Sequence, residues 1–398
     1  MKLSQRVSKI KPSATLEITA LAKKLKSEGK DIVAFTAGEP DFNTPDFIVK
    51  SAEIALKQGF TKYTPTAGTE ELRRAVAGRF REKNGIECDE KNIVVSSGAK
   101  SSLYHAVSAL INEGDEVVIP CPYWVTYTEQ VKLCGGVPVL VKTAAENGYK
   151  MTAGQLENAI TDKTRCLIIN SPCNPTGAVY TRDELKSIAE VCEKRAIDVI
   201  SDEIYENLVF GDSIFVSFAT LSEYAKNHTV TINGVSKSYA MTGWRIGYLC
   251  APAEVAKAIS AMQGHTTSNA CSISQFASVA AIEHGDEFIF KMRAEFERRR
   301  NVLVQNLTCV DGLEFCVPDG AFYLFADVSA FYGRGYKGEI ISDSQSFAKA
   351  LLDFGVAVIP GAAFGNDNCV RLSYSLGTDD IVKGTQKIKA FLSGLQKN

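Results

Sequence analysis

The stretch RCLIINSPCNPTGAVYTRDELKSIAEVCEKRAIDVISDE, residues 165–203, has the pattern of a strand, a helix and a second strand. RCLIIN and DVIS are short runs of apolar and β-branched residues, as found in buried strands. Between them, Thr181 and Glu184 have the spacing of a capping box, which predicts that a helix begins here and runs to Arg195. Strands separated by helices in this way predict parallel pairing.

The same alternation extends over the middle of the chain. Strand-like runs occur at residues 92–95, 115–120, 137–141, 165–170, 198–201, 229–233 and 245–250, with helical stretches between most of them. The sequence therefore predicts an α/β fold with a mostly parallel sheet covered by helices on both faces. Ligands of such sheets bind beyond the carboxyl ends of the strands.

The pattern changes at Asp286. A long charged helix is expected there, followed by the strand-like runs FYLFADV, VAVIP and VRLSY and by a last helix that ends near Leu395. These elements predict a second, smaller α+β domain, with which the first part of the chain is expected to pack.

The composition excludes several classes of function. The chain of 398 residues has 44 Lys and Arg against 46 Asp and Glu, so nothing indicates binding to nucleic acid or to an anionic membrane. No apolar run approaches the roughly 18 residues that span a bilayer, and the N-terminus has no apolar core like that of a signal peptide. Eleven cysteines without a CxxC pair favour a reducing compartment. We expect a cytoplasmic protein that binds small molecules and has no metal site.

Polar residues follow four of the predicted strands. The segment SSGAKSS follows residues 92–95, Asn174 closely follows RCLIIN, Asp202 directly follows DVIS, and Lys237 closely follows residues 229–233. Each alone is typical of a turn, a helix cap or a solvated charge. Together, at the edge of the sheet where ligands bind, they indicate a functional site.

This set of residue types suits pyridoxal phosphate. Its aldehyde needs a lysine amine, for which Lys237 is the candidate. Its ring nitrogen needs an acidic partner, for which Asp202 is the candidate. A helix N-terminus and a cation would hold the phosphate, polar groups the phenolic oxygen, and an aromatic ring would stack on the cofactor. The candidates for these contacts are Gly98, Ala99, Lys100 and Arg245 for the phosphate, Asn174 and Tyr205 for the phenolic oxygen, and Trp124 for the ring, with a core position as the alternative for Trp124.

Over nearly its whole length the chain resembles the fold-type I pyridoxal phosphate aminotransferases, and it most resembles the aspartate aminotransferase subgroup Ib. The motifs that support the resemblance are KPSAT (11–15), TAGEPDF (36–42), KYTPTAG (62–68), PYW (122–124), NSPCNPTG (170–177), SDEIYE (201–206), SKSYAMTGWRIGY (236–248) and VRLSY (370–374). The resemblance implies a large domain at 46–285 around a seven-stranded sheet and a small domain at 1–45 and 286–398. It also implies a homodimer with shared active sites.

The resemblance implies the same roles for the residues named above, with Lys237 also moving protons, and it adds further ones. Gly38 and Arg371 would hold the α-carboxylate of the substrate, beside Trp124 and Asn174, and Tyr63 would reach the phosphate in the neighbouring subunit. Relatives often carry a hydroxyl three residues before the lysine. This chain has Gly234 there, and Ser236 is expected to compensate.

The implied activity is transamination in two half-reactions, in a ping-pong mechanism, between aspartate or glutamate and the 2-oxo acids oxaloacetate and 2-oxoglutarate. In the subgroup, a lysine at the position of Lys100 goes with acidic substrates, and together with Thr15 it accompanies the use of prephenate as an acceptor. An aromatic or alanine aminotransferase and a carbon–sulfur lyase of the same fold are the alternatives. A non-catalytic regulator is disfavoured, because too few residues precede TAGEPDF for a DNA-binding module.

Overall fold

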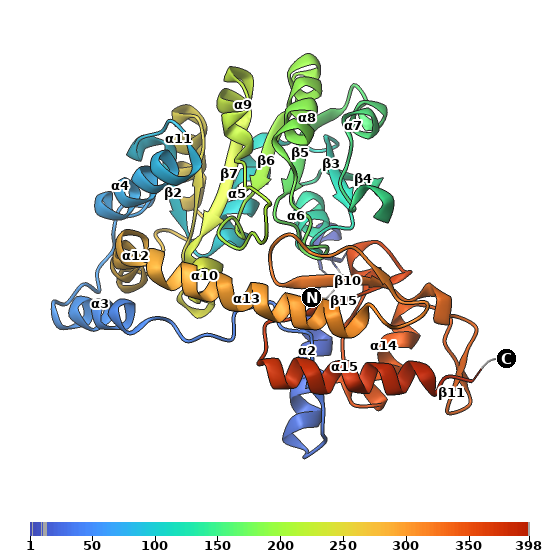
Figure 1. The fold of residues 1–398 in the computed structure, drawn as a ribbon. Coiled ribbons are helices and arrows are strands. Elements are labelled where there is room, and N and C mark those ends of the chain that lie inside the picture. Colours follow the sequence, from blue (N-terminus) through green and yellow to red (C-terminus); the bar gives the residue numbers. More distant parts are fainter. Residues whose placement is uncertain (2, 9, 11–13, 397–398) are drawn as a thin grey trace.

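A seven-stranded sheet lies in the middle of the chain, in the order β2-β8-β7-β6-β5-β3-β4 (Figure 1). The computed structural model describes residues 1, 3–8, 10 and 14–396. In the sheet, β8 is antiparallel to both of its neighbours and all other pairs are parallel. The predicted α/β fold is therefore confirmed. The strands are β2 (Ile93–Ser96), β3 (Glu116–Cys121), β4 (Val137–Lys142), β5 (Thr164–Asn170), β6 (Asp198–Asp202), β7 (Thr229–Gly234) and β8 (Gly247–Cys250).

Helices cover both faces of this sheet because its strands are apolar on both sides. Ile168 and Ile200 pack with α5 (Ala99–Leu110), α6 (Thr126–Leu133) and α11 (Ala253–Gly264). Their neighbours in sequence, Leu167 and Val199, point the other way and pack with helices of the opposite face, which are α7 (Ala153–Ala159), α8 (Arg182–Arg195) and α9 (Glu223–His228). On that opposite face, over β2 and β8, lie α4 (Glu70–Arg79) and α12 (Ser272–His284), and α3 (Asp46–Lys57) packs on α12.

Local signals explain where two elements begin. At the start of α8, Thr181 and Glu184 form the predicted capping box, in which the side chain of each accepts a hydrogen bond from the backbone N–H of the other. The strand expected at 245–250 is too long, since Arg245 has a φ of 57°, which an extended strand cannot accommodate. A short helical turn at Thr242–Trp244 precedes Arg245, and β8 begins only at Gly247.

A smaller antiparallel sheet, in the order β14-β15-β10-β9, forms the second layer of the molecule. The N-terminal segment lies with it, because β1 (Val33–Ala34) pairs in parallel with β13 (Val356–Ala357). The domain boundaries at residues 45 and 285 stay a prediction. The remaining elements are α1 (Gln5–Ser8), α2 (Ala14–Ser27), α10 (Val235–Ser238), α13 (Asp286–Leu307), β9 (Glu314–Phe315), β10 (Tyr323–Asp327), β11 (Gly335–Tyr336), β12 (Glu339–Ile340), α14 (Ser344–Asp353), β14 (Ile359–Pro360), β15 (Cys369–Ser373) and α15 (Thr378–Ser393).

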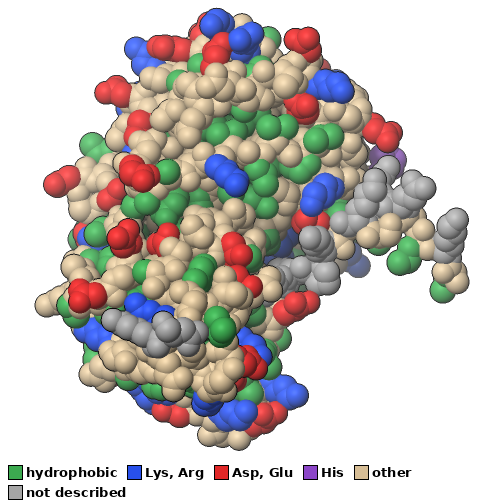
Figure 2. Space-filling view, turned by 90° about the vertical axis from the view of Figure 1, so that its right-hand side faces the viewer, with side chains coloured by type: hydrophobic (Ala, Val, Ile, Leu, Met, Phe, Trp, Pro, Cys, Tyr) green, Lys and Arg blue, Asp and Glu red, His purple; other side chains and the backbone are tan. Residues whose placement is uncertain are grey.

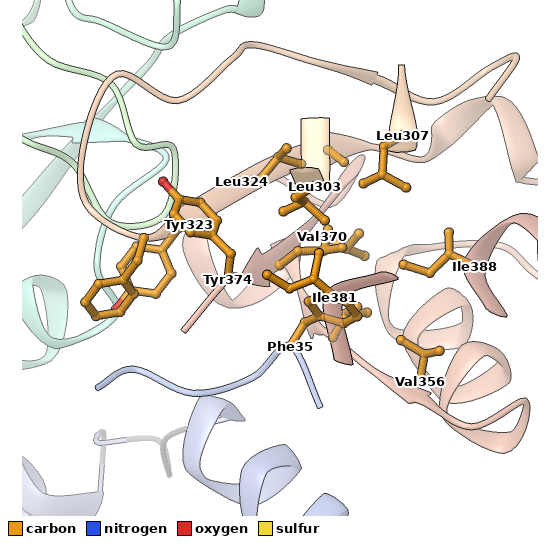
Figure 3. Close-up of a cluster of buried hydrophobic side chains, with 14 of the residues drawn as sticks. Phe35, Leu303, Leu307, Tyr323, Leu324, Val356, Val370, Tyr374, Ile381 and Ile388 are labelled. Carbon is orange, nitrogen blue, oxygen red and sulfur yellow. The ribbon is translucent and has the colours of Figure 1, made fainter. Parts of the chain in front are cut away.

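The core of this second layer joins residues from both ends of the chain (Figure 3). Phe35, directly after β1, is fully buried in one apolar cluster with Leu324, Val356, Val370 and Ile381. The surface differs from this core. On the face shown in Figure 2, acidic and basic side chains are interspersed, in keeping with their nearly equal numbers. Among the described helices, none is both long enough and apolar enough for a bilayer crossing.

We expect Phe35→Ala to lower the free energy of unfolding by about 3–5 kcal/mol, because it removes a buried ring and leaves a cavity. Urea unfolding followed by circular dichroism measures the change. Ile214→Ala is the control, since the Ile214 side chain is 77% exposed. Equal effects of the two substitutions would show that Phe35 does not link the N-terminal segment to the core.

Candidate active site

A cavity of about 480 Å³ lies where the carboxyl ends of β5 and β6 face the smaller sheet. Twelve of the fourteen predicted site residues line it, and they come from segments spread over the whole chain. They are Thr15, Gly38, Ala99, Lys100, Trp124, Asn174, Asp202, Tyr205, Ser236, Lys237, Arg245 and Arg371. Gly98 adjoins the cavity through Ala99. Tyr63 lies outside it with 91% of its surface exposed. In the KPSAT motif, residues 11–13 lie outside the described residues.

Lys237 is placed at the cavity by α10, the short helix that follows β7. Its half-buried side chain ends with Nζ donating a hydrogen bond to the carbonyl oxygen of Gly38 at 2.6 Å. Loss of contact with water lowers the pKa of Lys237 to about 8, with Arg245 and Arg371 acting in the same direction and Glu39 opposing them. A useful fraction of the amine is thus neutral, and therefore nucleophilic, near neutral pH.

Asp202 is the last residue of β6 and is only 4% exposed. Its Oδ2 accepts a hydrogen bond from the hydroxyl of Tyr127 at 2.8 Å, and its Oδ1 accepts one from the backbone N–H of Ile204 at 3.3 Å. Burial raises the pKa of Asp202 to about 6, and these hydrogen bonds limit the rise. The carboxylate has no salt bridge to a basic side chain among the described residues, so a cationic ring N–H would suit it.

The first turn of α5 forms a place for an anion. Among the described residues no side chain caps this helix, and Gly98 at its N-cap has a φ of 87°. The guanidinium of Arg245 lies beside Gly98, since a Cβ there would be 2.2 Å from Nη2 of Arg245. Nη1 of Arg245 donates to the carbonyl oxygen of Thr242 at 2.9 Å. Free backbone N–H groups and a cation meet here, as in phosphate sites at helix N-termini.

Close packing suits a glycine at position 234, where the resemblance led us to expect a hydroxyl. A Cβ on Gly234 would lie 3.0 Å from both Cα of Gly247 and the carbonyl oxygen of Ile246, so β7 and β8 leave little room for a side chain. Gly247 is still more confined, because its Cβ would lie 2.0 Å from the backbone nitrogen of Ala99. Ser236, the expected substitute, is buried at the cavity wall.

Arg371 is a buried cation without an acidic partner. It is 3% exposed, and its Nη1 donates to Oδ1 of Asn174 at 3.0 Å while its Nη2 donates to the carbonyl oxygen of Thr36 at 3.1 Å. Its guanidinium lies 4.4 Å from the ring centre of Tyr323, and its Nε is buried without a hydrogen-bond partner. Among the described residues no carboxylate pairs with it, so the site favours an anionic ligand.

Two further groups complete the cavity wall. The hydroxyls of Tyr205 and Tyr323 lie 2.8 Å apart, and burial raises the pKa of Tyr205 well above its usual value, so this phenol keeps its proton. The amine of Lys100 lies 4.9 Å from the ring centre of Trp124. Partial removal from water, together with the nearby Arg245, lowers the pKa of Lys100. Its amine makes no salt bridge with a described carboxylate.

Sequence reasoning missed Tyr127 and Tyr323. Tyr127 supports Asp202 and lies three residues after Trp124, a spacing that can place two side chains on the same side of a helical turn. Tyr323 lies under Arg371, and the register pairs Tyr323 with Ser373 on the strand that carries Arg371. Both tyrosines are buried and look like core residues in the sequence. Pairing the strand-like runs FYLFADV and VRLSY as neighbouring strands would have suggested that Tyr323 lies on the same face as Arg371.

A mostly parallel α/β sheet with a lysine and a buried carboxylate in one cavity, closed by a second small sheet, is an arrangement that suits pyridoxal phosphate-dependent enzymes. Residues 30–386 match the family aminotransferase class I and II, and the chain belongs to this family. The predicted resemblance and enzyme class are thereby confirmed.

Individual relatives agree with this assignment. The chain is 46% identical over 392 residues to a probable aspartate/prephenate aminotransferase of Aquifex aeolicus, covering 98% of each chain. It is similar to the crystal structure of the aspartate aminotransferase from Rhizobium meliloti, with a TM-score of 0.96, 40% identity and full coverage of both chains. It is also similar to the aspartate aminotransferase from Thermus thermophilus solved with maleate, with a TM-score of 0.93, 40% identity, and 98% of this chain and 100% of that chain covered.

We expect the Lys237 amine in the cofactor-free protein to be half-titrated near pH 8. Below this pH the amine is protonated and unreactive, and above it the neutral form predominates. Competitive labelling with acetic anhydride, followed by peptide mass spectrometry across a pH series, measures the midpoint. In urea-unfolded protein the same peptide should titrate with a pKa of about 10.4, the usual value for lysine. A midpoint near that value in the folded protein would contradict the assignment.

Proposed function

We propose that this protein is an aspartate aminotransferase that binds pyridoxal phosphate through Lys237. It moves the amino group between aspartate or glutamate and the corresponding 2-oxo acids in two half-reactions. The observation that carries the proposal is the pair of cations without carboxylate partners in one cavity, Arg371 and Lys100, since two cations suit a dicarboxylate. The names of the relatives support it, as does maleate, a dicarboxylate, in the Thermus thermophilus structure.

The residues present fit the cofactor. The uncapped first turn of α5 and the guanidinium of Arg245 would hold the phosphate, and the buried Asp202 would accept a hydrogen bond from the protonated ring nitrogen. Asn174 and Tyr205 would bind the phenolic oxygen, and Trp124 would stack on the ring. When bound, pyridoxal phosphate supplies an electron sink that stabilises negative charge on the substrate.

The protein itself contributes positioning and proton transfer. Arg371 binds the α-carboxylate of the amino acid through its free Nε and the outer edge of its guanidinium, with Gly38 beside it. Nζ of Lys237 is the base that takes the proton from the substrate Cα, and its lowered pKa suits this role near neutral pH. In the second half-reaction the same group returns a proton to Cα of the incoming acid.

Lys100 binds the distal carboxylate of the substrate in this proposal. Thr15 lines the same cavity, so the chain has both residues that the subgroup associates with prephenate. We therefore include prephenate as an additional acceptor, and the Aquifex aeolicus relative, named as an aspartate/prephenate enzyme, supports this.

We also propose that the active form is a cytoplasmic homodimer in which Tyr63 of one copy reaches the phosphate bound by the other. Tyr63 is 91% exposed in the single chain, and the exposed apolar side chains Val49, Ile54 and Leu56 lie on the nearby α3. An apolar helix surface of this kind suits burial by a second copy. All eleven cysteines are free thiols, in keeping with a reducing compartment.

Borohydride reduction of the purified protein followed by peptide mapping should place the pyridoxyl mass on Lys237. Lys237→Ala should abolish this label, whereas Lys100→Ala should keep it, because the amine of Lys237 reaches Gly38 in the cavity while that of Lys100 lies over the ring of Trp124. A label on another lysine would overturn the assignment of the cofactor site.

We expect Lys100→Ala to raise KM for aspartate and 2-oxoglutarate by about tenfold or more, the usual loss for one hydrogen bond to a charged group. KM for alanine and phenylalanine should change little, since these substrates have no distal carboxylate. Steady-state kinetics with the four substrates measures the difference, and Lys91→Ala, at an exposed position outside the cavity, is the control. An equal loss for all four substrates would assign Lys100 to the phosphate instead.

A further inference from the structure

Two glutamines with no exposed surface hold the segment 64–69, which directly follows Tyr63. Gln263 lies near the end of α11 and Gln275 lies in α12. Neither lines the active-site cavity. Burying an amide side chain is unfavourable unless its polar atoms find partners, so two such residues beside one short segment indicate a specific role.

Gln275 fixes both ends of this segment. Its Oε1 accepts a hydrogen bond from the backbone N–H of Thr69 at 2.8 Å, and its Nε2 donates to the hydroxyl of Thr64 at 3.1 Å. The same Nε2 donates to the carbonyl oxygen of Ala270 at 2.8 Å, which anchors the amide to the residues before α12. One side chain thus sets the distance between the two ends of the segment.

Gln263 fixes the middle of the segment to the end of β2. Its Nε2 donates to the carbonyl oxygens of Thr66 and Val95, both at 2.8 Å, and its Oε1 accepts from the hydroxyl of Ser96 at 2.6 Å. Gly68 packs so closely on this strand that a Cβ there would lie 2.7 Å from Cγ2 of Val95. The segment therefore cannot shift relative to the strand that leads into the first turn of α5.

Tyr63 contrasts with this fixed segment. The tyrosine is 91% exposed, while the two amides make three hydrogen bonds to the segment directly after it and three more to the residues that anchor them. A rigid backbone fixes the direction of the Cα–Cβ bond of Tyr63, so that only the side-chain rotamers remain to be ordered, which lowers the entropy cost of placing the ring in a binding site. Tyr63 does not line the active-site cavity of its own chain.

We infer that Gln263 and Gln275 are positioning residues that fix the direction in which Tyr63 of one copy of the chain reaches the phosphate bound by a second copy. The inference rests on the proposed homodimer with shared sites. It has a specific consequence for Gln275, which makes no hydrogen bond to β2: removing its amide should weaken cofactor binding in the opposite subunit and leave the site of its own subunit unchanged.

Two hybrid dimers, made by co-expression with different affinity tags, separate an effect on the opposite subunit's site from an effect on the site of the altered subunit itself. In the first, a Lys237→Ala chain is paired with a Gln275→Leu chain, so the only site with Lys237 receives Tyr63 from a chain with intact Gln275. In the second, a Lys237→Ala/Gln275→Leu chain is paired with an unaltered chain, so the only site with Lys237 receives Tyr63 from the altered segment. The dissociation constant for pyridoxal phosphate at Lys237 is measured by absorbance titration.

We expect the first hybrid to bind the cofactor as a Lys237→Ala/unaltered hybrid does, and the second to bind it about tenfold more weakly, since a hydrogen bond to a charged phosphate is lost or misdirected. Weaker binding in the first hybrid, or unchanged binding in the second, would overturn the inference. Ser278→Ala is the matched control. Ser278 is equally buried in α12 but bonds only to the carbonyl oxygen of Ser274, so both hybrids should be unaffected.

Two further variants keep the test decisive. If chains with Gln275→Leu do not assemble, Thr64→Val removes the hydroxyl that Gln275 binds and is placed in the same two hybrids, with the same outcomes. Tyr63→Phe is measured in parallel in a hybrid in which a Lys237→Ala/Tyr63→Phe chain is paired with an unaltered chain. If it has no effect, the shared site and the inference both fail. If it weakens binding and Gln275→Leu does not, only the inference fails. When both act, a chain with both substitutions should bind no more weakly than Tyr63→Phe alone.

Discussion

The contact between β8 and the first turn of α5 is the constraint on which the rest of the site depends. Gly247 lies so close to the backbone of Ala99 that no side chain fits between them. This packing brings the uncapped helix N-terminus against the connection from β7 to β8, which carries both Lys237 and Arg245. The proposed covalent anchor and the proposed phosphate-binding cation therefore belong to one short stretch of chain, and they keep a fixed relation to the helix N-terminus opposite them.

The charges of the cavity are arranged for a ligand and not for stability. Buried ions in proteins are normally paired, because an unpaired charge loses its hydration without compensation. Arg371 has only neutral acceptors, and Asp202 has only neutral donors. Each becomes fully satisfied when a group of opposite charge arrives. Departures of this kind from ordinary core packing are expected at functional sites, and here one lies at the end of β6 and the other in the middle of β15, on opposite sides of one cavity.

Much of the fold and part of the site follow from the sequence alone. Asp202 and Asn174 were recognised because each lies at the end of an apolar run, and strand ends are where this class of sheet binds ligands. Arg371 and Gly38 have no such signal, because they reach the site only when the smaller sheet packs over the larger one. Only the family resemblance indicates them. Tyr127 resembles a core residue until its hydroxyl is seen at Asp202. The sequence predicts that the strand begins at Arg245, whereas β8 begins at Gly247, because φ at Arg245 depends on its tertiary contacts.

The cavity also has a consequence for the rate at which ligands arrive. Five basic side chains and two acidic ones line it, although the chain as a whole carries a formal charge of −2. A concave surface with an excess of charge of one sign and with apolar walls concentrates its field at the opening and attracts ions of the opposite sign. Association of doubly charged acids and of phosphates should therefore be faster than that of singly charged ones. This advantage should shrink as ionic strength rises, because salt screens attraction over long distances much more than contacts inside the protein.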